Sequence, residues 1–319
     1  MTPIWRIFPR RNVRQQYMQN TPIACQMLLS NEDNTIIADE THLLNFEILH
    51  SPSKCSINVQ PRLSFHKGIY EITVENRLDI GYYQLRISAL PNEENELILG
   101  FISDVFEVID CQNKDNFVHK PLLRNYRELL FQCASLVMLE EYGVTMGSHV
   151  WDSGYIVARY LTEVYGKMEG TIVELGAGCG ILGLSLSKLF GENVKIILTD
   201  RSSQMDLIQQ NIQLNNLQSN CCFSELDWTN HVHISNLRMH TNGAVDFIVA
   251  ADVLYEEESI EPLVHLIRSL NPLKAVFLAQ KARERSGLSL ARCQSCLSEM
   301  NWDIVHESND VRVWLITTK

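Results

Sequence analysis

The segment Thr171–Gly183, which reads T-I-V-E-L-G-A-G-C-G-I-L-G, constrains the fold of this chain more than any other stretch. A strand-like apolar run ends in the glycines Gly176, Gly178 and Gly180, and a helical pattern follows. Glycine accepts positive φ angles and lets backbone N–H groups approach a ligand that a Cβ atom would obstruct. The segment therefore predicts a strand, a tight turn and a helix, although glycine spacing alone does not separate a ligand-binding turn from a structural one.

The residues after Val150 alternate between short apolar runs and helical patterns. This alternation predicts a mainly parallel sheet with helices on both faces, and buried parallel strands have continuous apolar sequences. The runs expected to form the central strands are 171–173, 195–199, 246–251 and 275–279. The expected fold of this half is an α/β, Rossmann-like domain.

Two acidic residues sharpen the interpretation of the glycine turn. Asp200 ends the run 195–199, about 20 residues after the glycines, where a carboxylate in dinucleotide-binding domains accepts hydrogen bonds from ribose hydroxyls. Glu174 ends the preceding strand beside the turn, where its charge would repel a pyrophosphate but suit a cationic amino acid and a sulfonium. The pair favours S-adenosylmethionine over NAD as the ligand.

Four features together resemble the seven-β-strand protein methyltransferases of the methyltransferase-like group: E-L-G-A-G-C-G at 174–180, Asp200, L-D-W at 226–228 and D-V-L-Y at 252–255. That group carries a D-x-x-Y element after its fourth strand, and its members chiefly methylate lysines. The similarity covers Gly147 to Lys319. It implies S-adenosylmethionine as the cofactor and a protein as the substrate.

The resemblance implies a cofactor site at the carboxyl ends of the strands. The residues assigned to the cofactor are Trp151, Glu174, Gly176, Gly178, Gly180, Asp200, Asp227, Trp228 and Ala250. Within this set the glycines would contact the methionine part, Asp200 the ribose, and Asp227 with Trp228 the adenine. Trp151 would flank the cofactor, and Ala250 would leave room at a strand end. Asp252 and Tyr255 would lie beside the transferring methyl group as the catalytic pair.

Several of these residues also have structural interpretations. Trp151 and Trp228 could be core aromatics, and Asp252 could cap the helix that follows it. The acidic residues Glu256, Glu257, Glu258 and Glu261 are typical of a solvated helix start, stabilised by the helix dipole, but they could also attract a basic target. The pair Cys293 and Cys296 lacks the further ligands of a structural zinc site, so no metal is expected.

The predicted activity is methyl transfer to a lysine side chain of a protein, with a translation factor or a ribosome-associated protein as one class of target. Methylation of a histidine or of a small molecule is the alternative among enzymes, because a fold does not determine a substrate. An inactive relative that serves as a binding module is the alternative from another class.

Residues 1–110 are expected to form a β-rich N-terminal domain. The runs 45–49, 55–59, 70–74, 82–88 and 97–108 alternate with period two between turn residues, as antiparallel strands do. The stretch Asp79–Leu85 resembles the D-x-G-x-Y-x-C element of immunoglobulin-like sandwiches, with Tyr83 as a corner tyrosine bonded to nearby backbone and Leu85 in place of the usual cysteine. An unrelated β-rich domain is the alternative.

Residues 111–146 are expected to form a helical connector before the methyltransferase domain at 147–319. Apolar residues recur at three- and four-residue steps between Leu122 and Tyr142, including Leu129, Leu130, Cys133, Val137 and Leu139.

Charge and cysteine content limit the partners and the compartment. The 27 Lys and Arg against 38 Asp and Glu give a net charge of -11, which disfavours nucleic acid. No apolar run is long enough for a membrane span, and we expect a monomer. Nine cysteines without framework spacing fit a reducing compartment, so the cytoplasm is expected, with the nucleus also consistent. Arg6, Arg10, Arg11 and Arg14 leave mitochondrial import as a minor alternative, which Pro3 and Pro9 disfavour.

Overall fold

The computed structural model describes residues 4–11, 14–18, 20–30, 44–51, 53, 55–59, 61–66, 69–75, 78–89, 97–109, 124–141, 145–283 and 286–318. The chain divides into two compact units. The C-terminal unit contains Phe131–Met138 and Val144–Lys319, and the N-terminal unit contains Thr2–Leu130 and Leu139–Gly143.

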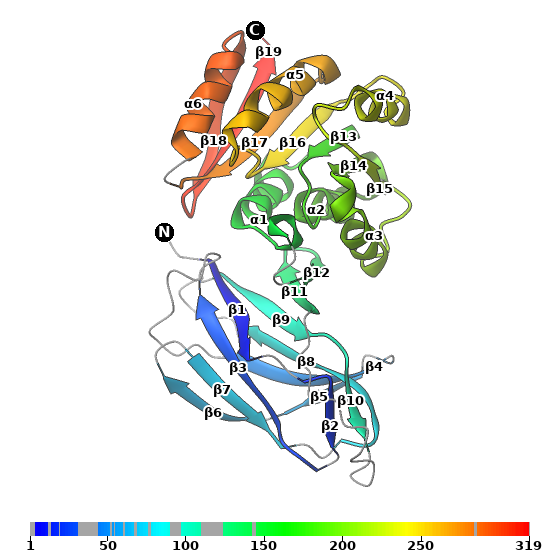
Figure 1. Ribbon diagram of the computed structural model, residues 1–319, viewed down its shortest axis with the longest axis vertical. Coiled ribbons are helices and arrows are strands. Elements are labelled where there is room, and N and C mark those ends of the chain that lie inside the picture. The colour runs from blue at the N-terminus through cyan, green and yellow to red at the C-terminus, as the bar shows by residue number, and fades with distance from the viewer. Residues whose placement is uncertain are drawn as a thin grey trace. The chain divides into compact units, whose positions relative to one another are not determined.

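The C-terminal unit is built on a seven-stranded sheet with the order β15-β14-β13-β16-β17-β19-β18 (Figure 1). Strands β13 to β17 are parallel, and β19 is antiparallel to both β17 and β18. Their bounds are Gly170–Leu175 (β13), Val194–Asp200 (β14), Cys221–Glu225 (β15), Phe247–Ala251 (β16), Ala275–Lys281 (β17), Met300–Ser308 (β18) and Val311–Thr318 (β19). The four predicted central strands are confirmed as parts of β13, β14, β16 and β17.

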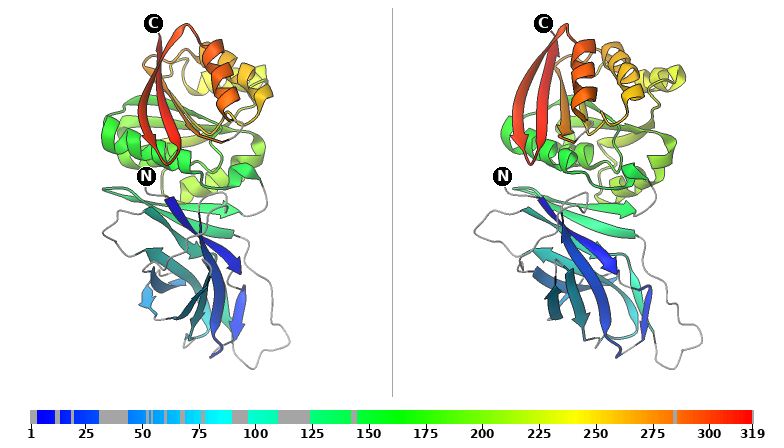
Figure 2. Two further views of the ribbon diagram at one scale, coloured as in Figure 1. Left: turned by 90° about the vertical axis from the view of Figure 1, so that its left-hand side faces the viewer. Right: turned by 60° about the vertical axis from the view of Figure 1, so that its left-hand side comes forward.

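Helices cover both faces of this sheet (Figures 1 and 2). They are α1 (Asp152–Arg159), α2 (Ile181–Phe190), α3 (Met205–Leu214), α4 (His231–His240), α5 (Ile260–Leu270) and α6 (Ser286–Cys296). Alternate strand residues, such as Val173 and Leu175 of β13, join α4, α5 and α6 in one hydrophobic cluster. The intervening residues, such as Glu174, therefore point to the face on which α1 and α2 lie.

Local signals set the ends of two helices. The Asn230 side chain accepts hydrogen bonds from the backbone N–H groups of Val232 and His233 and so caps the start of α4. Helix α5 ends at Asn271, whose left-handed conformation (φ 45°) suits asparagine. Among the described helices, none is long and apolar enough to cross a bilayer.

The order of the strands determines where a ligand can bind. From β13 the chain continues to β14 on one side and later returns to β16 on the other side. In open α/β sheets this reversal opens a crevice at the carboxyl ends of the strands. The glycine turn, Asp200 and Asp252 all follow carboxyl ends at this position.

Twelve strands, which belong to the N-terminal unit except for the first part of β12, are joined in one arrangement with the main order β2-β10-β8-β9-β1-β3-β7-β6. Strand β4 pairs with β5 and β8, and β11 pairs with β9 and β12. The bounds are Ile4–Arg11 (β1), Gln16–Met18 (β2), Ile23–Ser30 (β3), Leu44–Ser51 (β4), Ser56–Asn58 (β5), Arg62–His66 (β6), Ile69–Val74 (β7), Gly81–Ala89 (β8), Leu97–Ser103 (β9), Phe106–Ile109 (β10), Arg124–Leu130 (β11) and Ser135–Glu141 (β12). The predicted strands lie within or around β4, β5, β7, β8, β9 and β10.

One hydrophobic cluster fills the N-terminal unit and draws on β3, β4, β7, β8 and β10. The prediction for Tyr83 is confirmed: its hydroxyl donates to the Asp79 carbonyl oxygen at 3.0 Å. Leu85 is fully buried in the same cluster.

The helix predicted between Leu122 and Tyr142 is wrong over the described residues, which form β11 and β12; residues 111–123 and 142–144 lie outside the description. The three- and four-residue spacing arose because the apolar residues lie on two strands and the turn between them. Within β11 burial alternates with period two, and the buried positions include Asn125 and Arg127. Polar residues on a buried face conceal a strand from an analysis of apolar spacing.

A buried ion pair explains how β11 can turn Arg127 inward. Arg127 and Glu140 are 0% and 1% exposed, and their side chains meet at 2.9 Å. Arg127 also donates to the Ile7 carbonyl oxygen at 2.9 Å. The pair connects β11, β12 and β1 within the N-terminal unit.

Arg127→Met should destabilise the N-terminal unit by about 3–5 kcal/mol, because Glu140 would keep a buried charge without its partner. Thermal unfolding measured by near-ultraviolet circular dichroism tests this. Arg62→Met is the control, because Arg62 and Glu75 form an exposed pair with 82% and 55% of their side chains accessible. Equal loss in both variants would contradict the assignment.

Candidate functional site

The glycine turn between β13 and α2 has a backbone that only glycine adopts readily. Gly176, Gly178 and Gly180 have φ angles of 65°, 57° and 90°. A Cβ atom on Gly178 would lie 2.9 Å from the Gly147 carbonyl oxygen, and one on Gly176 would lie 2.8 Å from the Val253 side chain. The turn therefore exposes bare backbone because both space and conformation exclude a side chain.

Asp200, at the end of β14, holds this turn in place. One carboxylate oxygen accepts from the Gly178 N–H at 2.8 Å, and the other accepts from the Arg201 N–H at 2.7 Å. Burial raises the pKa of Asp200, while these two hydrogen bonds oppose that rise. A carboxylate offers about four acceptor positions. Asp200 therefore has acceptor positions left for two ribose hydroxyls, which fits S-adenosylmethionine.

Glu174 lies under the turn. Its side chain is 2% exposed and accepts from the Gly183 N–H at 2.8 Å, which fixes the first turn of α2 against β13. Burial raises the pKa of Glu174 to about 8, although this hydrogen bond acts in the opposite direction. The carboxyl group is therefore mainly neutral near pH 7. Its predicted contact with the cofactor stays a prediction.

Asp227 and Trp228 follow β15 on the far side of β14. The Leu226 N–H donates to the Asp200 carbonyl oxygen at 2.8 Å, which places the L-D-W element beside Asp200. The Asp227 side chain accepts from the Thr229 hydroxyl and N–H, and these bonds lower its pKa. Trp228 is half-buried, packs on the hydrophobic cluster and lies beside Gly176. Trp228 therefore packs against the hydrophobic core and also borders the glycine turn.

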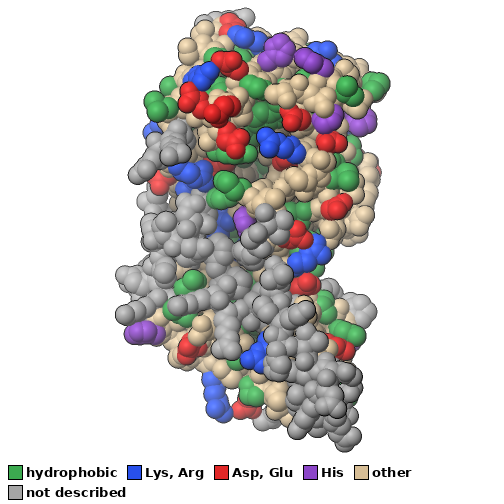
Figure 3. All heavy atoms as spheres, viewed as in Figure 1, with side chains coloured by type: hydrophobic (Ala, Val, Ile, Leu, Met, Phe, Trp, Pro, Cys, Tyr) green, Lys and Arg blue, Asp and Glu red, His purple; other side chains and the backbone are tan. Residues whose placement is uncertain are grey.

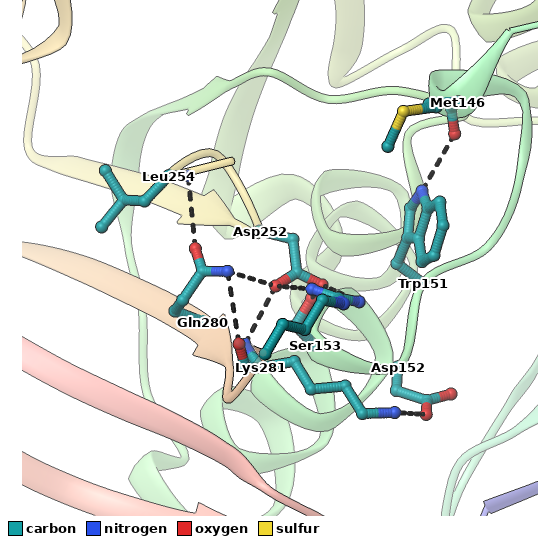
Figure 4. Close-up of polar contacts among 9 residues, drawn as sticks. Met146, Trp151, Asp152, Ser153, Asp252, Leu254, Gln280 and Lys281 are labelled. Carbon is teal, nitrogen blue, oxygen red and sulfur yellow. Dashed lines mark hydrogen bonds and ion pairs between the residues drawn. The ribbon is translucent and has the colours of Figure 1, made fainter. Parts of the chain in front are cut away.

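Trp151 and Ala250, the remaining predicted cofactor residues, belong to two other elements of the C-terminal unit. Trp151 directly precedes α1, is half-buried and donates from its indole nitrogen to the Met146 carbonyl oxygen at 3.0 Å (Figure 4). Ala250 is 1% exposed near the carboxyl end of β16. The structure thus brings all the predicted cofactor residues to the crevice edge of the sheet or to the elements next to it.

Two asparagine side chains connect the glycine turn to the backbone of β12 through hydrogen bonds. Asn211 of α3 donates to the Cys179 carbonyl oxygen at 3.0 Å, and Asn215 donates to the Asn211 carbonyl oxygen at 2.9 Å. Asn215 also exchanges hydrogen bonds with the backbone of Val137, at 3.0 and 2.8 Å. The sequence analysis did not identify these two asparagines.

Asp252 directly follows β16 and adopts a left-handed backbone conformation with φ 54°. Its carboxylate lies among donors from Ser153, Gln280 and the Lys281 backbone (Figure 4). Arg283 donates to the same carboxylate. The alternative that Asp252 caps the next helix is wrong, because the following helical turn begins at Glu257 with Glu256 at its N-cap.

Tyr255 is 57% exposed, so its ring can meet a substrate. Its pKa is raised, first because of partial burial and then because of the carboxylates of Glu256 and Asp200. Tyr255 keeps its proton at neutral pH.

Sequence reasoning missed Ser153, Gln280 and Arg283. Gln280 belongs to the end of β17 and Arg283 follows it, so their place after a predicted central strand was the available signal. Ser153 lies in the first turn of α1 and gave no signal of its own.

The acidic residues around the start of α5 are exposed. Figure 3 shows acidic side chains gathered on the C-terminal unit. Glu257 and Glu261 each pair with Arg292 at 2.7 Å. Among the described residues, no group of three or more His, Cys, Asp or Glu side chains is arranged to hold a metal ion.

Glu174 should make the C-terminal unit less stable as the pH rises. The folded chain keeps this carboxyl protonated up to about pH 8, whereas the unfolded chain ionises it near its ordinary value of 4.5. The unfolded state therefore binds fewer protons in that window, and the free energy of unfolding falls as pH rises. Glu174→Gln, which keeps an acceptor for Gly183, should remove this slope in urea unfolding at several pH values. Glu192→Gln, at an exposed position, is the control, and a slope that persists in Glu174→Gln would refute the prediction.

Comparison with known proteins agrees with this geometry. A family model described as lysine methyltransferase matches residues 131–290, which is half of the chain. Protein N-lysine methyltransferase METTL21A of Mus musculus is 28% identical over 162 residues, 48% of this chain and 71% of that protein. EEF1A lysine methyltransferase 3 of Xenopus tropicalis is 29% identical over 160 residues, 48% of this chain and 66% of that protein. Protein-lysine N-methyltransferase EEF2KMT of Homo sapiens is 23% identical over 224 residues, 64% of this chain and 65% of that protein.

The matched range begins at Phe131, the first residue of the segment Phe131–Met138 in the C-terminal unit, and it includes the glycine turn, Asp200 and the D-x-x-Y element. The chain therefore belongs to the lysine methyltransferase family.

Proposed function

We propose that this chain transfers a methyl group from S-adenosylmethionine to the Nζ atom of a lysine in a protein substrate. The observation that carries the proposal is the glycine turn anchored by Asp200, whose carboxylate keeps two acceptor positions for a ribose. The exposed Tyr255, which follows the carboxyl end of β16, offers a substrate side chain a polar contact.

S-adenosylmethionine supplies a methyl group that its sulfonium already activates. The chain's own residues then have to bind the donor, direct the amine and exclude water. A lysine must react as the neutral amine, and lowering its pKa from about 10.4 to a value near neutrality requires about 4 kcal/mol. Desolvation among apolar groups such as Ala250 and Val253 acts in this direction. We assign Tyr255 to the orientation of the amine, because its protonated hydroxyl accepts and donates hydrogen bonds.

A translation factor is the substrate class that we propose. Relatives that share the matched half are named for EEF1A and EEF2 as targets. The net charge of -11 and the exposed Glu256 and Glu258 favour a basic protein segment over nucleic acid. We also propose that the chain acts in the cytoplasm, with the nucleus as a second location, and as a monomer.

For the N-terminal unit we propose an immunoglobulin-like sandwich. The Tyr83 hydroxyl bond to the Asp79 carbonyl and the burial of Leu85 support it. So does the hydrophobic cluster of this unit, to which strands including β2, β4, β7 and β10 contribute buried residues.

The function is tested by incubating the purified chain with tritium-labelled S-adenosylmethionine and an extract of cells that lack it. We expect a labelled protein band that yields methyllysine after hydrolysis and a lysine-containing site by mass spectrometry. Labelled methylhistidine, or label only in small molecules, would support the enzymatic alternatives instead. Failure to bind S-adenosylmethionine in calorimetry would support an inactive binding module.

Asp200→Ala should weaken S-adenosylmethionine binding by about 10- to 100-fold, since a hydrogen bond to a charged acceptor contributes about 1.5–3 kcal/mol. The variant loses the ribose contacts and the support of Gly178 together. Isothermal calorimetry measures the affinity, with Asp206→Ala, an exposed acid on α3, as the control. Unchanged affinity in Asp200→Ala would exclude the ribose role.

A further inference from the structure

Asp252 differs from Asp200 in how fully its carboxylate is occupied. The first Asp252 oxygen accepts from Gln280 Nε2 at 2.9 Å, from the Lys281 N–H at 2.9 Å and from Arg283 at 3.0 Å. The second accepts from the Ser153 hydroxyl and from Arg283 at 3.3 Å. Five hydrogen bonds fill the approximately four acceptor positions of a carboxylate. The side chain is only 9% exposed, so Asp252 has no acceptor position left for an incoming amine.

Arg283 connects two segments that are distant in the sequence. Its guanidinium contacts both Asp252 oxygens, and the same group lies over the Trp151 ring, 5.4 Å from the centroid. Trp151 is held in turn by its bond to the Met146 carbonyl oxygen (Figure 4). Arg283 thus joins the segment that leads to Tyr255 with the segment that precedes α1.

The backbone at Asp252 needs such support. A left-handed conformation costs a residue other than glycine free energy, although aspartate tolerates it better than most. The Asp252 N–H donates to the Ala279 carbonyl oxygen at 2.9 Å, so the turn is bound to β17 through its backbone as well as its side chain. Tyr255 follows three residues later, and its position depends on this turn.

We infer that Arg283 is a positioning residue for methyl transfer. It clamps Asp252 and Trp151 together and so fixes where Tyr255 meets the substrate amine. The inference rests on the proposed function and refines it: Asp252 acts as an anchor for the D-x-x-Y segment, and the proton of the amine leaves by another route than the Asp252 carboxylate.

The anchor and the proton-acceptor roles of Asp252 give opposite results when Arg283 is removed. If Asp252 is an anchor, the loss of Arg283 removes its strongest partner, so the turn loosens and methyl transfer slows. If Asp252 is a proton acceptor, it loses a donor that occupies lone pairs on both of its oxygens, and methyl transfer persists or accelerates.

The experiment compares Arg283→Met, Arg283→Lys and the control Arg268→Met in the full chain. Arg268 also pairs with a carboxylate, Glu299 at 2.7 Å, and donates to a backbone carbonyl, but on α5 away from these contacts. The initial rate of tritium transfer from S-adenosylmethionine into the extract is measured with the dissociation constant of S-adenosylhomocysteine by calorimetry. Hydrogen–deuterium exchange of a peptide covering 250–258 reports on the turn itself.

For Arg283→Met we expect the rate to fall about tenfold or more, which corresponds to about 1.4 kcal/mol in the barrier. We expect the dissociation constant to change less than about threefold, because the glycine turn and Asp200 are intact. Amide exchange in 250–258 should become faster, and Arg283→Lys should recover part of the rate because it restores one charged contact. Arg268→Met should match the wild type in all three measurements.

Wild-type transfer in Arg283→Met would overturn the inference and leave the proposed function standing. A fall in rate without faster amide exchange in 250–258 would also overturn it. So would a fall in rate accompanied by an equal weakening of S-adenosylhomocysteine binding. If the wild-type chain transfers no label, the proposed function fails and the inference fails with it.

Discussion

The hydrogen bond from the Gly178 N–H to the Asp200 carboxylate is the interaction on which the site depends. It joins the turn after β13 to the end of β14, so two parallel strands fix one bare loop. The loop can be bare because Gly176 and Gly178 leave no room for side chains. A fixed turn beside a partly occupied carboxylate gives a nucleoside a prepared binding surface without rearrangement.

Three carboxyl groups at this edge of the sheet have different environments and therefore different chemistry. Glu174 is buried, mainly neutral near pH 7 and bonded to α2. Asp200 is supported by two backbone N–H groups and retains free acceptor positions. Asp252 is filled by donors from α1, β17 and Arg283. One group stabilises the fold, one can bind a ligand and one holds a loop, although the sequence shows each only as an acid after a strand.

Much of the C-terminal half was predictable because each central strand is a continuous apolar run, and three of the four end at, or directly before, a glycine or an acid. The residues Gly176, Asp200 and Asp252 could be placed on one edge from the parallel topology alone. The contacts of Arg283 and Ser153 could not be predicted, because they depend on how α1 and the end of β17 pack in three dimensions. The strands β11 and β12 were missed for a related reason: the inward-facing Arg127 and Glu140 neutralise each other, and a single sequence does not show such a pair.

The amides of Asn211 and Asn215 define how far the catalytic half extends toward the N-terminus. They run from the Cys179 carbonyl in the glycine turn to the Val137 backbone in β12. A shortened chain that starts at Gly147, where the sequence resemblance begins, would remove Val137 and with it the donor to the Asn215 side-chain oxygen and one acceptor of the Asn215 amide nitrogen. The segment around Val137 therefore belongs to the support of the glycine turn, in agreement with its place in the C-terminal unit.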